Sequence, residues 1–317
     1  MVAQASILRT RRRILIVGSG DVARRALAGL APRIADGRVR VFALVRRPEA
    51  AAELRAGGAL PVRADLDAPR SLYRLAGLAP TLIHCAPPDD ASGRDRRTRG
   101  LLAALARRTA PRRLVYISTS GVYGDCAGAD VDETRPLQAR TARARRRVDA
   151  ETRLRHFARA HGSALAILRA PGIYAADRLP LARLERHDPV LVREEDVFTN
   201  HVHADDLARM ALAACFRGRH RVYNASDDSA LRMGDYYDQV ADAFGLPRPP
   251  RLPRAALVER LSPLTLSFMA ESRRLVNLRV KRELRFRFAY PTTADGLAAA
   301  RQEHPRTSEP TPCFTCT

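Results

Sequence analysis

The chain has 317 residues, of which 46% are hydrophobic and 28% are charged, and its net charge is +21. This length predicts about two domains, and the composition is typical of a soluble globular protein. No apolar run approaches the ~18 residues of a membrane span. The N-terminal MVAQASILRTRRR has its basic residues after a weakly apolar part. This order is unlike that of a secretory signal, so we expect a cytoplasmic protein.

The positive charge comes almost wholly from arginine, since Lys281 is the only lysine. The arginines are spread along the chain, aromatic residues make up 5% and tryptophan is absent. A dedicated nucleic-acid surface would gather charge and interleave aromatic residues, so we expect no specific nucleic-acid partner. The five cysteines are too scattered for a disulfide framework. The CxxC of Cys313 and Cys316 lacks further ligands, so we predict no metal site.

A dinucleotide-binding turn is predicted near the N-terminus. Ile14 to Val17 reads as a strand buried on both faces, and an amphipathic helical pattern follows after the turn. The turn fits GxGxxA, with residues Gly18, Ser19, Gly20, Asp21, Val22 and Ala23. Gly18 permits a tight turn, Gly20 lets the backbone approach a pyrophosphate, and Ala23 allows close helix packing. The alternative is a glycine turn with no ligand.

Strands and helices alternate over about 170 residues. Strands are expected at 38–45, 59–63, 81–86, 113–118 and 164–170, with helices at 48–56 and 98–109. This alternation predicts an α/β fold with a Rossmann-type, doubly wound parallel sheet. We assign 13–176 to an NAD(P)-binding domain and 177–300 to a small, mostly helical substrate region, with 200–228 returning to the core. Residues 301–317 are expected to be a disordered tail.

Ligands of such sheets bind beyond the carboxyl ends of the strands. Arg46 and Arg47 follow the second strand, where an NAD-specific enzyme usually has an acidic residue. Guanidinium groups suit a 2′-phosphate, so we favour NADP, with NAD possible because arginine is common in this chain. Asp65 and Leu66 after the third strand are expected at the adenine, and Ala86 and Pro87 after the fourth beside the phosphate and ribose.

Four motifs follow in order: ISTSGVYG at 117–124, RAPGIY at 169–174, HVHADDLA at 201–208 and YNASDD at 223–228. Together they resemble the extended or atypical short-chain dehydrogenase/reductase superfamily, in its NAD-dependent epimerase/dehydratase branch, over about residues 13–298. The resemblance implies an NAD(P)-dependent oxidoreductase or epimerase/dehydratase-like enzyme. Its substrate would be a small carbonyl, hydroxyl or nucleotide-sugar compound. Such relatives often dimerise, but the arginine density leaves both monomer and homodimer open.

The resemblance also implies roles for single residues. Gly18, Gly20 and Ala23 would bind the pyrophosphate, and Thr119 takes the Ser/Thr active-site position, with Ser120 beside it. Pro171, Gly172 and Tyr174 would border the nicotinamide and the substrate. His203 and Asp205 would lie at the junction with the substrate region. For Asp205 we favour an N-cap role over catalysis, because two aspartates precede an apolar helix.

The chain departs from this family at the YxxxK active site. The tyrosine position falls on Arg143 and the lysine position on Arg147. Arg147 could contact a ribose and supply positive charge, but a guanidinium cannot transfer a proton as a phenol does. Either Tyr174, Tyr123 or His203 performs the proton transfer, or the protein is a catalytically silent NAD(P)-binding sensor or scaffold.

A helix is expected across 141–157, and its arginines allow two interpretations. Arg140, Arg143 and Arg147 would share one face and could hold a phosphorylated or carboxylated substrate. Alternatively, this face is solvated and Arg147 forms an i, i+4 ion pair with Glu151.

Overall fold

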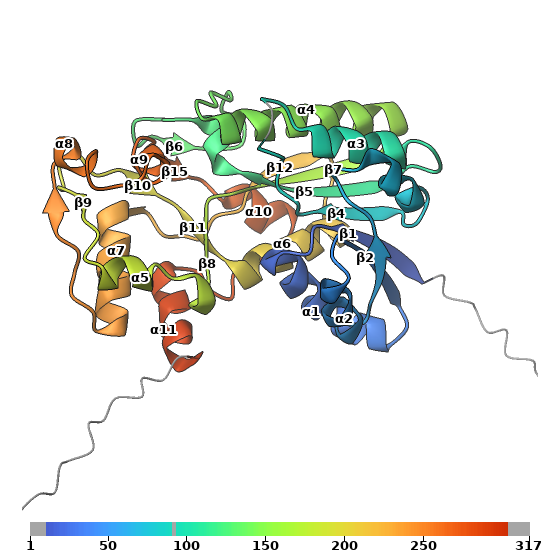
Figure 1. The fold of residues 1–317 in the computed structure, drawn as a ribbon, viewed down its shortest axis with the longest axis horizontal. Helices are drawn as coiled ribbons and strands as arrows, with labels where there is room; N and C mark the ends of the chain where they lie inside the picture. The colour runs from blue at the N-terminus through green and yellow to red at the C-terminus, as the bar shows by residue number, and fades with distance from the viewer. Residues whose placement is uncertain (1–10, 91–92, 304–317) are drawn as a thin grey trace, which may run out of the picture.

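The computed structural model describes residues 11–90 and 93–303. Its centre is a seven-stranded sheet with the order β12-β7-β5-β4-β1-β2-β3, in which every neighbouring pair is parallel (Figure 1). The strands are β1 (Arg12–Val17), β2 (Val39–Val45), β3 (Ala59–Arg63), β4 (Thr81–His84), β5 (Arg113–Thr119), β7 (Ala164–Ala170) and β12 (Arg221–Asn224). The predicted doubly wound α/β fold is confirmed, and the strand order reverses between β1 and β4.

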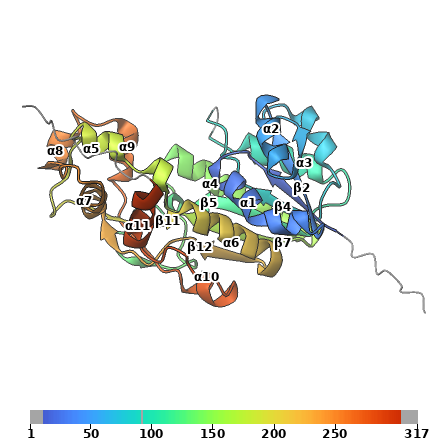
Figure 2. The same ribbon diagram turned by 90° about the horizontal axis from the view of Figure 1, so that it is seen from below.

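Helices cover both faces of the sheet (Figures 1 and 2). One face carries α1 (Asp21–Ala35), α2 (Glu49–Ala56) and α6 (Ala204–Arg217), and the other carries η1 (Pro69–Leu75), α3 (Arg96–Leu105) and α4 (Ala142–His161). Ile14 and Ile16 belong to the first core cluster, and Leu15 and Val17 to the second. Alternate side chains of β1 therefore fill opposite cores, as expected of a strand buried on both faces.

Two helices extend beyond their expected bounds, and a residue at the helix end explains each difference. α3 begins at Arg96, two residues earlier than expected, because the Asp95 carboxylate accepts from the Thr98 amide at 3.0 Å and caps the helix. α4 runs to His161, beyond the expected end at 157, and stops at Gly162 with φ +62°. A left-handed residue at this point favours glycine and ends the helix.

The rest of the chain forms a smaller unit beside the carboxyl ends of the strands, at the left of Figure 1. Its helical segments are η3 (Ala176–Arg178), α5 (Leu181–Glu185), α7 (Met233–Phe244), α8 (Arg254–Leu257), α9 (Pro263–Phe268) and α11 (Thr293–Glu303). Helix α10 (Leu278–Glu283) instead packs beside β12, and its Val280 belongs to the core of the large sheet. The remaining elements are η2 (Ser120–Tyr123), β6 (Asp130–Val131), β8 (Gly172–Tyr174), β9 (Val190–Leu191), β10 (Phe198–Thr199), β11 (His201–His203), β13 (Leu231–Arg232), β14 (Arg251–Leu252) and β15 (Arg274–Leu275). A separate core cluster packs α5 and α7 together with Leu297 of α11.

Helix α11 extends to Glu303, so the first three residues of the predicted tail are helical. Residues 304–317, and with them the CxxC of Cys313 and Cys316, lie outside the described residues. The domain boundaries at 176 and 300 stay predictions. Within the described ranges, no helix combines the length and the apolar character needed to cross a membrane.

A buried ion pair fastens α4 to the sheet. Glu151 has no exposed surface, and its carboxylate accepts from Arg169 of β7 at 2.8 and 3.2 Å and from Ser118 of β5 at 2.7 Å. Arg155 adds a bond of 2.9 Å from the next turn of the helix. Burial acts to raise the pKa of Glu151, but the hydrogen bonds and charge of Arg169 hold it below its ordinary value. Glu151 is therefore ionised inside the fold.

We expect Glu151→Ala to destabilise the protein by about 3–5 kcal/mol, because it leaves the buried Arg169 charge without a partner. Urea unfolding midpoints measure the effect. The matched control is Glu53→Ala, which removes an exposed ion pair with Arg24 at 3.4 Å; the change there should stay within about 1 kcal/mol. Equal shifts for both variants would contradict the anchoring role.

Candidate functional site

The glycine turn after β1 has the geometry of a ligand-binding turn. Gly18 has φ +103°, and a Cβ there would lie 2.7 Å from the backbone nitrogen of Ala86, so only glycine fits. A Cβ on Gly20 would meet no atom within 4 Å, which leaves open space in front of the N-terminus of α1. Ala23 is buried against the core. The turn therefore presents free backbone amides to an open space, as anion binding requires.

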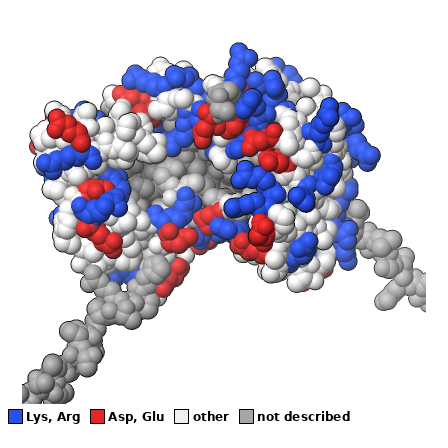
Figure 3. Space-filling model, in the orientation of Figure 1, with Lys and Arg blue, Asp and Glu red and all other residues white. Residues whose placement is uncertain are grey.

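That space belongs to a cavity of about 710 Å³. It runs from the turn past the carboxyl ends of β5 and β7 to the C-terminal unit, and Figure 3 shows the molecule hollowed between its two parts. The predicted site residues that line it are Gly20, Asp21, Val22, Ala23, Thr119, Arg147, Pro171 and Gly172. The structure thus brings together residues from four separate parts of the sequence.

The other predicted site residues do not line this cavity: Gly18, Ser19, Arg46, Arg47, Asp65, Leu66, Ala86, Pro87 and Tyr174. Arg46 and Arg47 are exposed immediately after β2, and neither guanidinium forms a hydrogen bond with a described residue. The nearby Asp67 is taken up by two bonds from Arg97, at 2.6 and 2.7 Å. Both guanidinium groups therefore remain available to an anion outside the cavity.

Thr119 ends β5 at the wall of the cavity. Its Oγ1 accepts from the Gly121 amide at 3.3 Å and so caps the short helix η2. This bond uses an oxygen lone pair, and the hydroxyl proton remains available. Thr119 can therefore donate a hydrogen bond to a substrate oxygen while its position is fixed by the cap.

Helix α4 directs two arginines into the cavity. The Arg147 guanidinium donates to the carbonyl of Ile117 at 2.7 Å and to the hydroxyl of Tyr116 at 3.0 Å, both on β5. Arg143 lies one turn earlier, and its guanidinium stacks over the ring of Phe268, 4.5 Å from the ring centroid. The positions at which the resemblance expects a tyrosine and a lysine thus carry two permanent positive charges.

Two details expected of this helix are wrong. Arg140 precedes the helix, because Thr141 is the N-cap, and it does not line the cavity. The Arg147–Glu151 pair is not formed, because Glu151 is taken up by Arg169 and Arg155. The face of α4 that carries Arg147 and Glu151 is directed at the sheet and the cavity.

The predicted alternative proton donors are all engaged. Tyr174 is buried, and its hydroxyl donates to the Thr292 carbonyl at 3.2 Å, away from the cavity. The Tyr123 hydroxyl donates to Asn224 at 2.7 Å, and burial raises its pKa to about 12. Burial lowers the pKa of His203. The Tyr174 phenol therefore does not line the cavity that contains Thr119.

The N-cap of α6 differs from the expectation for Asp205. His203 is the N-cap, since its Nδ1 accepts from the Asp205 amide at 3.3 Å. Asp205 lies in the first turn and forms an ion pair with Arg25 of α1 at 2.7 Å. The N-cap prediction for Asp205 is wrong, because the helix begins at Ala204, two residues earlier than an N-cap at Asp205 would require.

Residues of the C-terminal unit that sequence reasoning did not identify form the far wall. They are Arg183, Phe198, His201, Met233, Tyr236, Tyr237, Leu264, Thr265, Ser267, Phe268, Glu271 and Arg273. His201 stacks on Tyr236 with ring centroids 4.0 Å apart, and burial lowers the pKa of His201 to about 3. Leu264 and Phe268 on α9 are exposed hydrophobic residues facing this space. Only the tertiary fold brings these segments together, and apart from His201, the first residue of the HVHADDLA motif, they lie outside the motifs found in the sequence.

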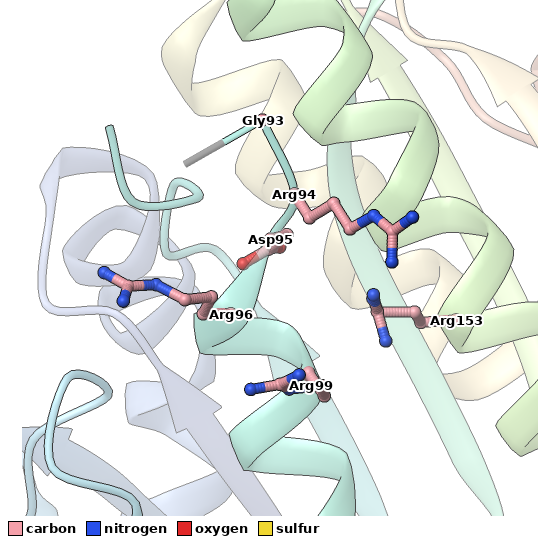
Figure 4. A pocket seen from close by; sticks show the side chains of 6 residues that line it. All are labelled: Gly93, Arg94, Asp95, Arg96, Arg99 and Arg153. Atoms are coloured by element: carbon pink, nitrogen blue, oxygen red, sulfur yellow. The ribbon is translucent and has the colours of Figure 1, made fainter. Parts of the chain in front are cut away.

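A second hollow of about 440 Å³ lies between α3 and α4 (Figure 4). Its lining residues are Gly93, Arg94, Asp95, Arg96, Arg99 and Arg153. It contains none of the predicted site residues. Among the described residues, no group of three or more His, Cys, Asp or Glu side chains could hold a metal ion. On the face shown in Figure 3, basic side chains are interspersed with acidic ones.

Comparison with known families agrees with this architecture. The model of the NAD dependent epimerase/dehydratase family matches residues 28–226, more than half of the chain. The chain belongs to this family. The match begins after the glycine turn, so the evidence for the turn is its own geometry. A member of this family is expected to bind a nicotinamide cofactor, and the open space at Gly20 fits the pyrophosphate of such a cofactor.

Solved structures of the same fold cover nearly the whole chain. A functionally unknown conserved protein from Silicibacter pomeroyi DSS has a TM-score of 0.77 and 31% identity, over 92% of this chain and 99% of that one. UDP-glucose 4-epimerase from Thermotoga maritima, solved with UDP-glucose, has a TM-score of 0.72 and 17% identity over 92% and 97%. A short-chain dehydrogenase/reductase protein from Agrobacterium tumefaciens with bound NAD has a TM-score of 0.70 and 18% identity over 92% and 98%. No curated protein sequence matches the chain.

A buried carboxyl group supports the wall behind His201. Asp227 is 2% exposed, and its Oδ1 accepts from the Ser229 amide at 2.9 Å. Its Oδ2 is buried and has no hydrogen-bond partner among the described residues. Burial raises the pKa of Asp227 to about 8. Between about pH 4 and pH 8, the native protein therefore keeps this proton, whereas the unfolded chain has already released it.

We expect Asp227→Asn to stabilise the protein increasingly as the pH rises, by about 1.4 kcal/mol per pH unit, because the native wild type alone must retain this proton. Thermal unfolding at about pH 5 and about pH 9 measures the difference between variant and wild type. The buried histidines titrate in both proteins and cancel in that difference. The control is Asp228→Asn, whose exposed carboxylate pairs with Lys281. An Asp227→Asn difference that does not change with pH would contradict the buried proton.

Proposed function

We propose that the protein is an NADP-preferring oxidoreductase or epimerase/dehydratase-like enzyme that acts on a small carbonyl, hydroxyl or nucleotide-sugar substrate. The observation that carries this proposal is the single cavity that joins the glycine turn to Thr119 and to the C-terminal unit. A bound dinucleotide would extend from Gly20 along the strand ends, as in other doubly wound sheets. Its nicotinamide would supply or accept a hydride next to Thr119.

Backbone amides and side chains at the ends of several strands support the cofactor assignment. The backbone amides at Gly20 and the N-terminus of α1 would hold the pyrophosphate. Arg46 and Arg47 would bind a 2′-phosphate, since both are exposed at the end of β2. Asp65, Leu66, Ala86 and Pro87 follow β3 and β4 and would border the adenosine half. Pro171 and Gly172 would border the nicotinamide, because both line the cavity after β7.

The reacting end is suited to charge stabilisation more than to proton transfer. Thr119 would donate a hydrogen bond to the substrate oxygen, and Arg147 of α4 would add positive charge from a position fixed by its bonds to β5. Arg143 stays protonated and cannot act as the acid or base. Burial raises the pKa of the neighbouring Cys85 thiol to about 12. A proton of the substrate oxygen would therefore exchange with water.

The second candidate is a catalytically silent NAD(P)-binding sensor or scaffold. The observation in its favour is that the Tyr123 and Tyr174 hydroxyls are both bonded to other parts of the fold. Such a protein would bind the dinucleotide but would not turn over a substrate. Turnover of any member of a carbonyl, hydroxyl and nucleotide-sugar panel would exclude it.

The first test is titration of the purified protein with NADPH and NADH, followed by fluorescence. Arg46→Ala and Arg47→Ala should each weaken NADPH binding by about 1.5–3 kcal/mol, the range of charge-assisted hydrogen bonds, and leave NADH binding unchanged. The matched control is Arg40→Ala, which removes an exposed arginine nearer the opposite end of β2. Binding of neither nucleotide would mean that the glycine turn is only structural, and the proposed function would fail.

Thr119→Ala should lower turnover by about 10²–10³-fold, because it removes a hydrogen bond made to charge that develops on the substrate oxygen. NADPH affinity should persist, and Thr119→Ser should retain most of the activity. The measurement is the cofactor absorbance change with whichever panel member the wild type accepts. Unaltered turnover in Thr119→Ala would remove this residue from the mechanism.

A further inference from the structure

The arginines of the cavity are not all alike. Five line it: Arg143, Arg147, Arg178, Arg183 and Arg273. Three of them form ion pairs, namely Arg178 with Asp21 at 3.1 Å, Arg183 with Asp188 at 3.3 Å and Arg273 with Glu271 at 2.8 Å. Within the described part of the chain, Arg143 and Arg147 form no ion pair, and Glu271, which is paired with Arg273, acts on Arg143 only through its charge at longer range. The uncompensated charge of the cavity therefore lies on α4, beside Thr119.

The acidic residues of α4 are committed elsewhere. Glu151, four residues after Arg147, is bonded to Arg169 and Arg155. Asp149 accepts from Arg153 at 2.7 Å and from the Asp95 amide at 2.9 Å. Neither carboxylate neutralises the two cavity arginines, although Glu151 lies at i+4 from Arg147, a spacing that would allow an ion pair.

This arrangement has a cost in stability. Arg143 and Arg147 are like charges at i and i+4, a spacing at which like charges destabilise a helix. Burial, and after it the charge of Arg147, lower the pKa of Arg143. Unfavourable charge that is kept in a cleft is a mark of a ligand-binding position.

The local chemistry specifies the ligand. Phe268 covers one face of the Arg143 guanidinium, while no described residue accepts its hydrogen bonds. The planar, forked set of donors on the Arg143 guanidinium matches the geometry of a carboxylate or a phosphate. Arg147 is held by Ile117 and Tyr116, so it adds charge at a fixed position.

We infer that the substrate carries an oxyanion, a carboxylate or a phosphate, which Arg143 binds beside Thr119 with Arg147 supplying additional positive charge. The inference rests on the proposed function, because it places this group next to the reacting carbon. The pyrophosphate of a cofactor belongs to the Gly20 end of the cavity and leaves the α4 end free. Arg143 would thus determine which substrates bind, at the position where family members with the YxxxK motif have the tyrosine that acts as acid and base.

The test is isothermal titration calorimetry with malonate and with inorganic phosphate, in the absence and presence of NADPH. Neutral malonamide serves as the uncharged probe. The variant is Arg143→Gln, and the matched control is Arg159→Gln, which removes an exposed arginine of the same helix outside the cavity. We expect saturable binding of one oxyanion per chain, weakened at least tenfold in Arg143→Gln and unchanged in Arg159→Gln. The stronger of the two probes identifies the oxyanion.

Thermal unfolding separates a binding role from a structural one. Arg143→Gln should unfold at the same or a higher temperature than the wild type, because it relieves repulsion with Arg147. The proposal is overturned if neither anion binds saturably, if malonamide binds as well as malonate, or if both variants lose binding equally. NADPH binding without anion binding refutes this inference alone. Anion binding without NADPH binding refutes the proposed function alone.

Discussion

The buried ion pair of Glu151 and Arg169 is the constraint on which the cavity depends. It joins α4 to β7, and the bond from Ser118 extends it to β5. A carboxylate without exposed surface stays ionised only when such partners surround it, so the position of α4 along the sheet is fixed within narrow limits. One helical turn away, this register brings Arg147 against the Ile117 carbonyl. The positive charge of Arg147 at the cavity is therefore held in place by an interaction inside the core.

The fold determines which of the many arginines are paired with a carboxylate and which are not. Many arginines form exposed ion pairs that contribute little, such as Arg24 with Glu53 and Arg248 with Asp242. Arg25 joins α1 to α6 through Asp21 and Asp205 and so secures the helix that begins at the glycine turn. Composition alone cannot distinguish these arginines from Arg143. The distinction lies in which carboxylates the fold brings within reach of each one.

Much of the fold followed from local patterns, and the substrate side of the site did not. β3 and β7 both have their predicted bounds, and for β7 the reason is that a run of buried residues between turns admits few other structures. The sequence predicts the glycine turn and Thr119 as site residues because their motifs are short and contiguous, and Gly20 and Thr119 line the same cavity. Tyr174 was misjudged because the sequence gives no sign that α11 packs against its hydroxyl, where a Cβ on Gly296 would lie 2.4 Å away. His201 and Phe268 meet at the cavity only through tertiary contacts between distant segments.

The family resemblance leads to the expectation of a phenol and an ammonium where this chain has Arg143 and Arg147, and two guanidinium groups would contribute differently to a reaction. A phenol with a pKa near 10 is useful near neutral pH because an adjacent cation lowers its pKa, and the pair can then move a proton. Arg143 and Arg147 keep their charge throughout this range, so they offer a fixed field and fixed hydrogen bonds. A fixed positive field favours a negative group that is present before, during and after the reaction. The chemistry of α4 is therefore better suited to holding and orienting an anionic substrate than to exchanging protons with it.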